Sequence, residues 1–204
     1  MATLRGLTAE KLKGGLVLAA DGKGPLLQRD YWGVIASCRT TPGGVIDVLR
    51  FKFPQLVPEE LARFERLEET DEALDVGDEM TVNIRGAGTF GVRILHVSPQ
   101  SFTIGTIKGH PETGRVTFGA YRNPHDDVVF HIRSRARSSS TRRFLGYLLA
   151  GEPMQMNVWC ELINRTAASV GDGVIGFVMA STKTVRDDEG DRQACCPTYI
   201  ATGG

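Results

Sequence analysis

The residue types that could carry out chemistry gather in the segment GHPETG, residues 109–114. Within it, His110 and Glu112 stand two residues apart, and an imidazole and a carboxylate form an acid–base pair when both reach the same substrate. The two glycines and the proline of this segment are turn residues, because glycine accepts a positive φ and proline fixes φ. The segment is therefore predicted to be a hairpin tip, on which His110 and Glu112 are catalytic groups, caps of backbone amides or side chains exposed to solvent.

The chain on both sides of this tip alternates apolar and polar residues, which is the pattern of a strand with one buried face. Five such runs follow one another, and the spacers between them have turn chemistry. The runs cover residues 79–84, 89–97, 101–108, 115–122 and 127–137. They predict a meander of antiparallel strands with one apolar face and one polar face.

Two strands and two short helices are predicted before the meander. Residues 14–22 and 26–38 have strand patterns bounded by glycine and charged residues. A helix is predicted to begin at Thr41, a suitable cap followed by proline, and to end at Pro54. A second helix is predicted over residues 58–69, because its apolar residues recur at helical spacing at Leu61, Phe64 and Leu67.

A longer amphipathic segment follows the meander, from about Thr141 to Val170. An antiparallel sheet with one apolar face needs a cover, and this helix is the largest element available to provide it. We therefore predict an α+β helix-grip fold, in which a curved antiparallel sheet wraps around a long C-terminal helix. The domain is expected to span residues 29–171, with an N-terminal extension at residues 1–28 and a C-terminal strand and tail at residues 172–204.

Curvature parts a sheet from the helix that covers it, so this arrangement is expected to enclose a ligand cavity. His110 and Arg137 are candidate polar contacts for the head group of a ligand. The apolar wall is expected to come from Phe102, Ile104, Phe118, Phe130, Met154, Trp159 and Ile163. The alternative is that these apolar side chains fill a core and leave no cavity.

Composition argues against several classes of protein. The chain has 24 basic and 24 acidic residues, so no global charge attracts it to nucleic acid or to an anionic membrane. No apolar run is long enough for a signal peptide or a membrane span, which predicts a cytoplasmic location. The histidines fall on separate strands and turns, the four cysteines lack metal-site spacing, and no phosphate or dinucleotide motif occurs. We therefore expect no metal and no cofactor.

The segment FTIGTIKGHPETGRVTF, with VVFHIRSRARSSS and EPMQMNVW further on, resembles a family of uncharacterised bacterial and plant proteins of the DUF1990 type. The shared motif reads Gly-Thr-Leu-x-Gly-His-Pro-Glu-x-Gly and corresponds to residues 105–114. This chain departs from the pattern at Arg115 and Val116, where members often have an acidic pair. The family is similar to the START and Bet v 1-like superfamily, so the resemblance implies a helix-grip cavity for apolar molecules and implies no activity.

Three functions remain open from the sequence. The first is binding of a small apolar or amphipathic molecule, without catalysis. The second is an enzyme of the same fold, in which His110 and Glu112 are the acid–base pair. The third is a structural or interaction protein with a filled core, forming a homodimer through an exposed sheet edge.

Overall fold

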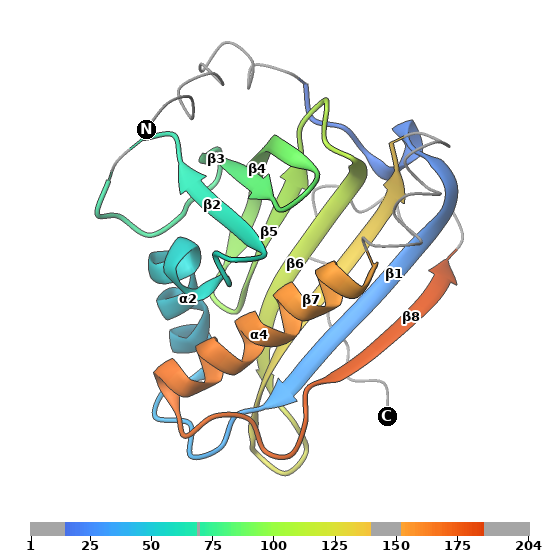
Figure 1. Cartoon of the computed structure of the whole chain (residues 1–204). Helices are drawn as coiled ribbons and strands as arrows, with labels where there is room; N and C mark the ends of the chain where they lie inside the picture. Colours follow the sequence, from blue (N-terminus) through green and yellow to red (C-terminus); the bar gives the residue numbers. More distant parts are fainter. Residues whose placement is uncertain (1–14, 69, 140–151, 186–204) are drawn as a thin grey trace.

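The computed structural model describes residues 15–68, 70–139 and 152–185. Within these ranges, eight strands form one curved antiparallel sheet, with helices packed against its concave face (Figure 1). The strand order is β2-β3-β4-β5-β6-β7-β1-β8. The strands are β1 (Lys23–Val34), β2 (Ala62–Arg66), β3 (Glu79–Ile84), β4 (Gly88–Ser98), β5 (Ser101–Thr106), β6 (Glu112–Arg122), β7 (Val128–Ser138) and β8 (Met179–Val185).

The predicted meander is confirmed. Strands β3 to β7 follow one another in the chain and in the sheet, and each pair is antiparallel. The faces also agree with the alternation, because Ile104, Phe118 and Ile132 are buried in the core. A register shift between Ile94 and His96 marks an irregularity in β4, of the kind that bends a sheet.

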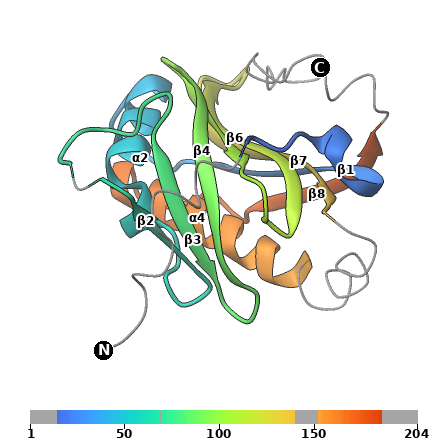
Figure 2. The same ribbon diagram turned by 90° about the horizontal axis from the view of Figure 1, so that it is seen from above.

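Two helices lie on the concave side of the sheet, α2 (Pro42–Leu56) and α4 (Glu152–Val170), as the view from above shows (Figure 2). The Thr41 side chain caps α2 by accepting a hydrogen bond from the Gly44 N–H at 3.1 Å. The predicted end of this helix at Pro54 is wrong. The helix continues to Leu56, because a kink at Lys52 (φ −112°, ψ 18°) accommodates the proline inside it.

The predicted helix over residues 58–69 is also wrong, since this segment contains strand β2, which pairs with β3 at the edge of the sheet. Its buried residues are Ala62 and Phe64, which alternate along a strand. Glu59 and Arg63 form an ion pair at 3.3 Å without a helix to position them. Residues 14–22 were likewise predicted as a strand, but the described part contributes one bridge at Leu16 and a short 3₁₀ turn.

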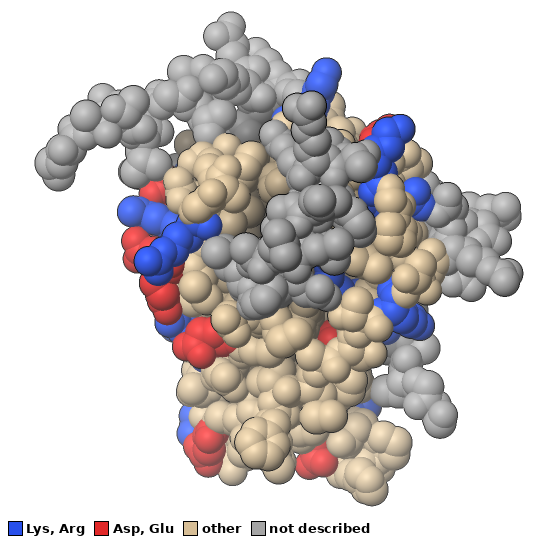
Figure 3. All heavy atoms as spheres, turned by 45° about the vertical axis from the view of Figure 1, so that its right-hand side comes forward, with Lys and Arg blue, Asp and Glu red and all other residues tan. Residues whose placement is uncertain are grey.

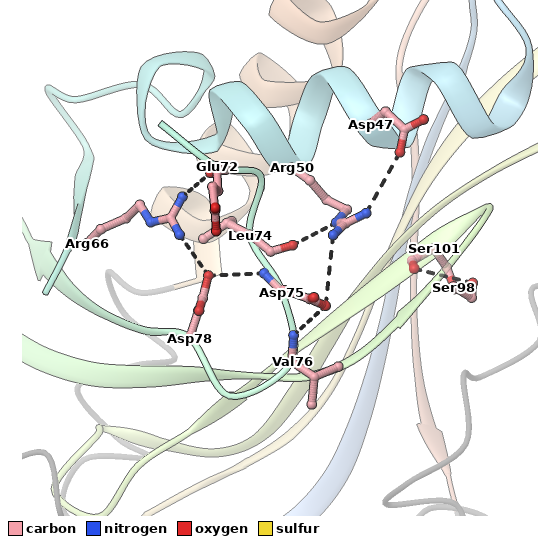
Figure 4. A network of polar contacts seen from close by, with 10 residues as sticks. All are labelled: Asp47, Arg50, Arg66, Glu72, Leu74, Asp75, Val76, Asp78, Ser98 and Ser101. Carbon is pink, nitrogen blue, oxygen red and sulfur yellow. Dashed lines mark hydrogen bonds and ion pairs between the residues drawn. The ribbon is translucent and has the colours of Figure 1, made fainter. Parts of the chain in front are cut away.

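Polar contacts anchor the connection between β2 and β3 (Figure 4). Arg50 of α2 donates from Nε to the Leu74 carbonyl at 2.7 Å, and the Leu74 side chain is fully buried. Arg66 of β2 forms an ion pair with Asp78 at 2.8 Å, and Asp78 also accepts from the Asp75 N–H. This connection therefore covers one end of the core, next to α2.

The C-terminal part of the chain adds one helix and one strand among the described residues. Helix α4 begins at Glu152, and the first part of the predicted long helix, residues 141–151, lies outside the described ranges. The C-terminal strand expected within residues 172–204 is β8, which begins at Met179. It pairs with β1, and β1 in turn pairs with β7, so both ends of the described chain belong to the sheet.

The surface carries charges of both signs. Basic and acidic side chains both occur on the face seen in Figure 3, with uncharged areas between them. This distribution agrees with the balanced composition of the chain. Among the described residues, no helix has the length and apolar character needed to cross a bilayer.

Candidate functional site

A cavity of about 580 Å³ lies between the concave face of the sheet and helix α4. Its wall is mainly hydrocarbon, and it reaches the exposed turn at residues 85–87 between β3 and β4. The apolar lining includes Leu61, Ala62, Phe64, Val82, Ile84, Phe90, Val92, Ile104, Val116, Ala136, Val158 and Trp159. A volume of this size lies within the usual range for small-molecule sites.

Glu112, the first residue of β6, lies at the polar end of this cavity. One carboxylate oxygen forms an ion pair with Arg29 of β1 at 3.3 Å, and the other accepts from Gln155 of α4 at 3.1 Å. The Arg29 side chain is 2% exposed and that of Glu112 is 13% exposed. Three separate elements therefore meet at one partly enclosed carboxylate.

His110 lines the same end of the cavity and is buried. Its Nδ1 lies 3.1 Å from the Glu112 N–H and 2.9 Å from the Glu112 carbonyl oxygen. The ring also packs edge-to-face against Phe90, with centroids 5.3 Å apart. The backbone of Glu112 therefore fixes the orientation of the imidazole through Nδ1.

The hairpin tip that carries these residues is held by its threonine and glycines. Thr106 Oγ1 accepts from the Gly114 N–H at 3.0 Å, which ties the two strands together across the tip. Gly109 has a φ of +105°, as the turn requires. Gly114 has a φ of +153°, and a Cβ there would lie 2.2 Å from the Arg135 carbonyl oxygen. The GHPETG segment is thus a turn, as predicted, that directs His110 and Glu112 to the cavity.

The structure brings together only some of the residues predicted from the sequence. Ile104, His110, Glu112 and Trp159 line the cavity. Phe102, Phe118, Phe130 and Ile163 are 0% exposed and pack in the core instead. For Phe102 and Phe118 the reason is helix α2, whose Phe53 meets their rings at 5.8 and 5.2 Å.

Arg137 does not belong to the cavity lining. It follows Ala136, which lines the cavity, so the alternation of β7 directs Arg137 to the opposite face. It pairs there in register with Thr113, and both lie close to Gly22. Met154 lies in α4, but its side chain is outside the described part of the structure.

A second polar cluster lies on the convex face of the sheet, around Asp30 of β1. This carboxylate accepts hydrogen bonds from Gln28, His131 and Arg133, at 2.7, 2.8 and 2.5 Å. Burial by itself raises the pKa of Asp30, but the hydrogen bonds from His131, Arg133 and Gln28 outweigh burial and hold the pKa well below its usual range. The charge of Arg133 on the outer face of β7 is therefore neutralised by a carboxylate of the neighbouring strand.

Sequence reasoning missed Arg29 and Gln155 as parts of the candidate site. Arg29 lies in a strand pattern far from the hairpin in the chain, and its charge at a buried strand position is the signal that could have indicated it. Gln155 gives no such signal, because a glutamine near the start of a helix is ordinary. Ser134 of β7, also missed, lines the cavity on the buried face of its strand.

Comparison with solved structures identifies the fold as Bet v 1-like. Norcoclaurine synthase from Thalictrum flavum, solved with dopamine and hydroxybenzaldehyde, is 10% identical, with 83% of this chain and 95% of that chain covered and a TM-score of 0.51. The di-domain ARO/CYC StfQ from the steffimycin biosynthetic pathway is 11% identical, with 76% and 52% covered and a TM-score of 0.50. The matched region thus spans about half of the StfQ chain. At these identities the similarity concerns the fold alone.

Sequence comparison gives a family without a known activity. No curated protein matches the chain. The model of the domain of unknown function DUF1990 matches residues 58–165, which is more than half of the 204 residues. The matched region runs from the β2 segment to helix α4 and includes the whole GHPETG hairpin. The chain therefore belongs to the DUF1990 family.

Proposed function

We propose that this protein binds a small apolar or amphipathic molecule in the cavity between the sheet and α4. The observation that carries this proposal is the lining, which is mainly hydrocarbon and includes a polar cluster where His110, Glu112 and Gln155 meet. An apolar body would bury its surface against the wall, which is favourable by roughly 25 cal/mol per Å². A polar head group would then lie beside Glu112.

The proposal takes the architecture to be a helix grip, with the sheet curved around one long C-terminal helix. Helix α4 supports this, since it packs against β1 and β7 on the concave side. Two solved proteins of similar fold also support a role with small molecules, because one is a synthase holding dopamine and hydroxybenzaldehyde and the other an ARO/CYC protein of a biosynthetic pathway. The domain limits at residues 29 and 171, and a homodimer, stay predictions.

The proposal is tested by native mass spectrometry of protein purified from its source organism. We expect a small molecule that stays bound under native conditions and is released on denaturation. A Val116→Phe variant places a larger side chain in the cavity wall and should retain less of it. A wild-type protein that carries no such molecule, and takes none from a lipid and metabolite extract of the same cells, would contradict the proposal.

The second candidate is an enzyme of this fold. It is favoured by one observation, the carboxylate of Glu112 and the imidazole of His110 lining the same end of one cavity. Incubating the extract with wild type and with Glu112→Gln separates the two candidates. A compound converted by wild type and untouched by the variant would support catalysis, whereas binding alone leaves every compound unchanged.

A further inference from the structure

Trp159 of α4 has a buried hydrogen-bond donor that finds no acceptor among the described residues. The residue is 7% exposed, and its Nε1 atom has no hydrogen-bond partner in the described part of the chain. An indole N–H normally finds an acceptor when it is buried, because desolvation without a partner is costly. The missing partner therefore needs an explanation.

The position of Trp159 explains the missing acceptor, because this residue is part of the cavity wall, where a ligand could provide it. Its ring packs edge-to-face against Phe118, with centroids 5.6 Å apart, and this contact holds the ring in the wall. Trp159 follows Gln155 by four residues, so the two side chains lie on the same face of α4, about 6 Å apart along the helix axis. Gln155 contacts Glu112, so Trp159 lies one helical turn from the polar end.

An ordered water molecule is a poor acceptor for this site. A buried water needs two to four polar partners. The cavity that Trp159 lines is instead walled mainly by hydrocarbon side chains, including Ile104, Val116 and Val158. An oxygen atom that is part of an apolar molecule can accept from the indole while the rest of the molecule contacts this wall.

We propose that the ligand carries a hydrogen-bond acceptor, a carbonyl or ether oxygen within an otherwise apolar body, and that the indole of Trp159 donates to it. The inference rests on the proposed function, since it requires that the cavity hold a ligand. It narrows the ligand class to apolar ketones, aldehydes, esters or ethers, with the oxygen about one helical turn from the head-group end.

Two naphthalenes of nearly the same shape test the proposal, 2-acetylnaphthalene with a carbonyl oxygen and 2-ethylnaphthalene without one. Affinities come from titration followed by ¹H–¹⁵N correlation spectra, in which a Trp32→Phe variant assigns the indole signal of Trp159. We expect the ketone to bind at least about tenfold more tightly than the hydrocarbon. We also expect it alone to move the Trp159 indole proton signal downfield.

Two variants complete the experiment. Trp159→Phe keeps an aromatic ring without the donor and should bind both naphthalenes with similar affinity. Val158→Ala alters the neighbouring wall and should keep the preference for the ketone. Equal affinities in wild type, with an unmoved indole signal, would overturn the inference and leave the proposed function standing. No saturable binding of either compound would overturn both, and the wild-type affinities do not depend on the folding of a variant.

Discussion

Glu112 shows how a single side chain joins the polar end of the cavity to the rest of the fold. Its two carboxylate oxygens meet a guanidinium from β1 and a carboxamide from α4. A buried ion pair contributes little net stability, because desolvation offsets much of the attraction. A charge pair kept beside a cavity is therefore better explained by recognition of a ligand than by stability, which agrees with the proposed function.

Asp30, on the convex face, has a structural role that pH can reveal. Its depressed pKa means that the ionised form stabilises the fold at pH values above the unfolded pKa near 4, and this stabilisation is lost as the pH falls towards the lower folded pKa. We expect Asp30→Asn to lower the free energy of unfolding by about 3 kcal/mol near neutrality, since Arg133 and His131 lose a charged partner.

The difference between wild type and Asp30→Asn should shrink by about 1 kcal/mol between pH 5 and pH 3. Urea denaturation at several pH values in this range measures it. A Glu68→Gln variant serves as the control, because Glu68 is exposed and should show a small difference at every pH. A gap between wild type and Asp30→Asn that stays constant down to pH 3 would show that ionised Asp30 does not stabilise the fold.

At the scale of the element, the β5–β6 hairpin depends on close approach of two backbones. Gly114 pairs with Ala136 of β7, and the space for a Cβ is filled by backbone atoms of β7. Around Gly109, in contrast, no atom of the described residues lies within 4 Å of a Cβ position. Glycine is therefore required at position 114 because there is no space for a side chain, and at position 109 because of its positive φ.

We expect Gly114→Ala to cost about 3 kcal/mol or more of unfolding free energy, because the methyl group would overlap the β7 backbone. Gly109→Ala should cost about 1 kcal/mol, since only the positive φ opposes it. Guanidinium denaturation of the two variants measures the difference. Equal losses of unfolding free energy in the two variants would mean that β6 and β7 can move apart at Gly114 without cost.

For the whole molecule, the important division is between a packed core under α2 and an open cavity beside α4. Rings of Phe53, Phe102 and Phe118 fill the first region, and Phe64 packs against Phe53 at its border with the cavity. The second keeps about 580 Å³ free. The same sheet face therefore contributes stability at one end and a binding space at the other.

Enlarging one side chain in each region tests this division. Val116→Phe adds atoms to the cavity wall and should change the unfolding free energy by less than about 1 kcal/mol, because the ring enters free space. Ile132→Phe adds atoms at a fully buried core position and should cost about 2 kcal/mol. Thermal and urea denaturation compare the stabilities of the two variants. A larger loss of unfolding free energy for Val116→Phe than for Ile132→Phe would show that the cavity is not free space.

The sequence by itself determined the antiparallel meander, the hairpin at residues 109–114 and the cap of α2, because alternation and turn chemistry act between residues close together in the chain. It could not separate helix from strand over residues 58–69. The spacing of Leu61, Phe64 and Leu67 suits a helix, while Ala62 and Phe64 suit a strand. Pairing with β3 decided the outcome.

Only the tertiary structure decided which apolar side chains border a cavity and which fill the core. That division depends on where α2 and α4 lie over the sheet. The alternation of apolar and polar residues within one strand does not determine either position. The same holds for the partners of Glu112, because Arg29 is 83 residues away and Gln155 is 43 residues away along the chain. Contacts between residues so far apart in the chain form only when the sheet has curved around its helices. Local periodicity therefore cannot predict them.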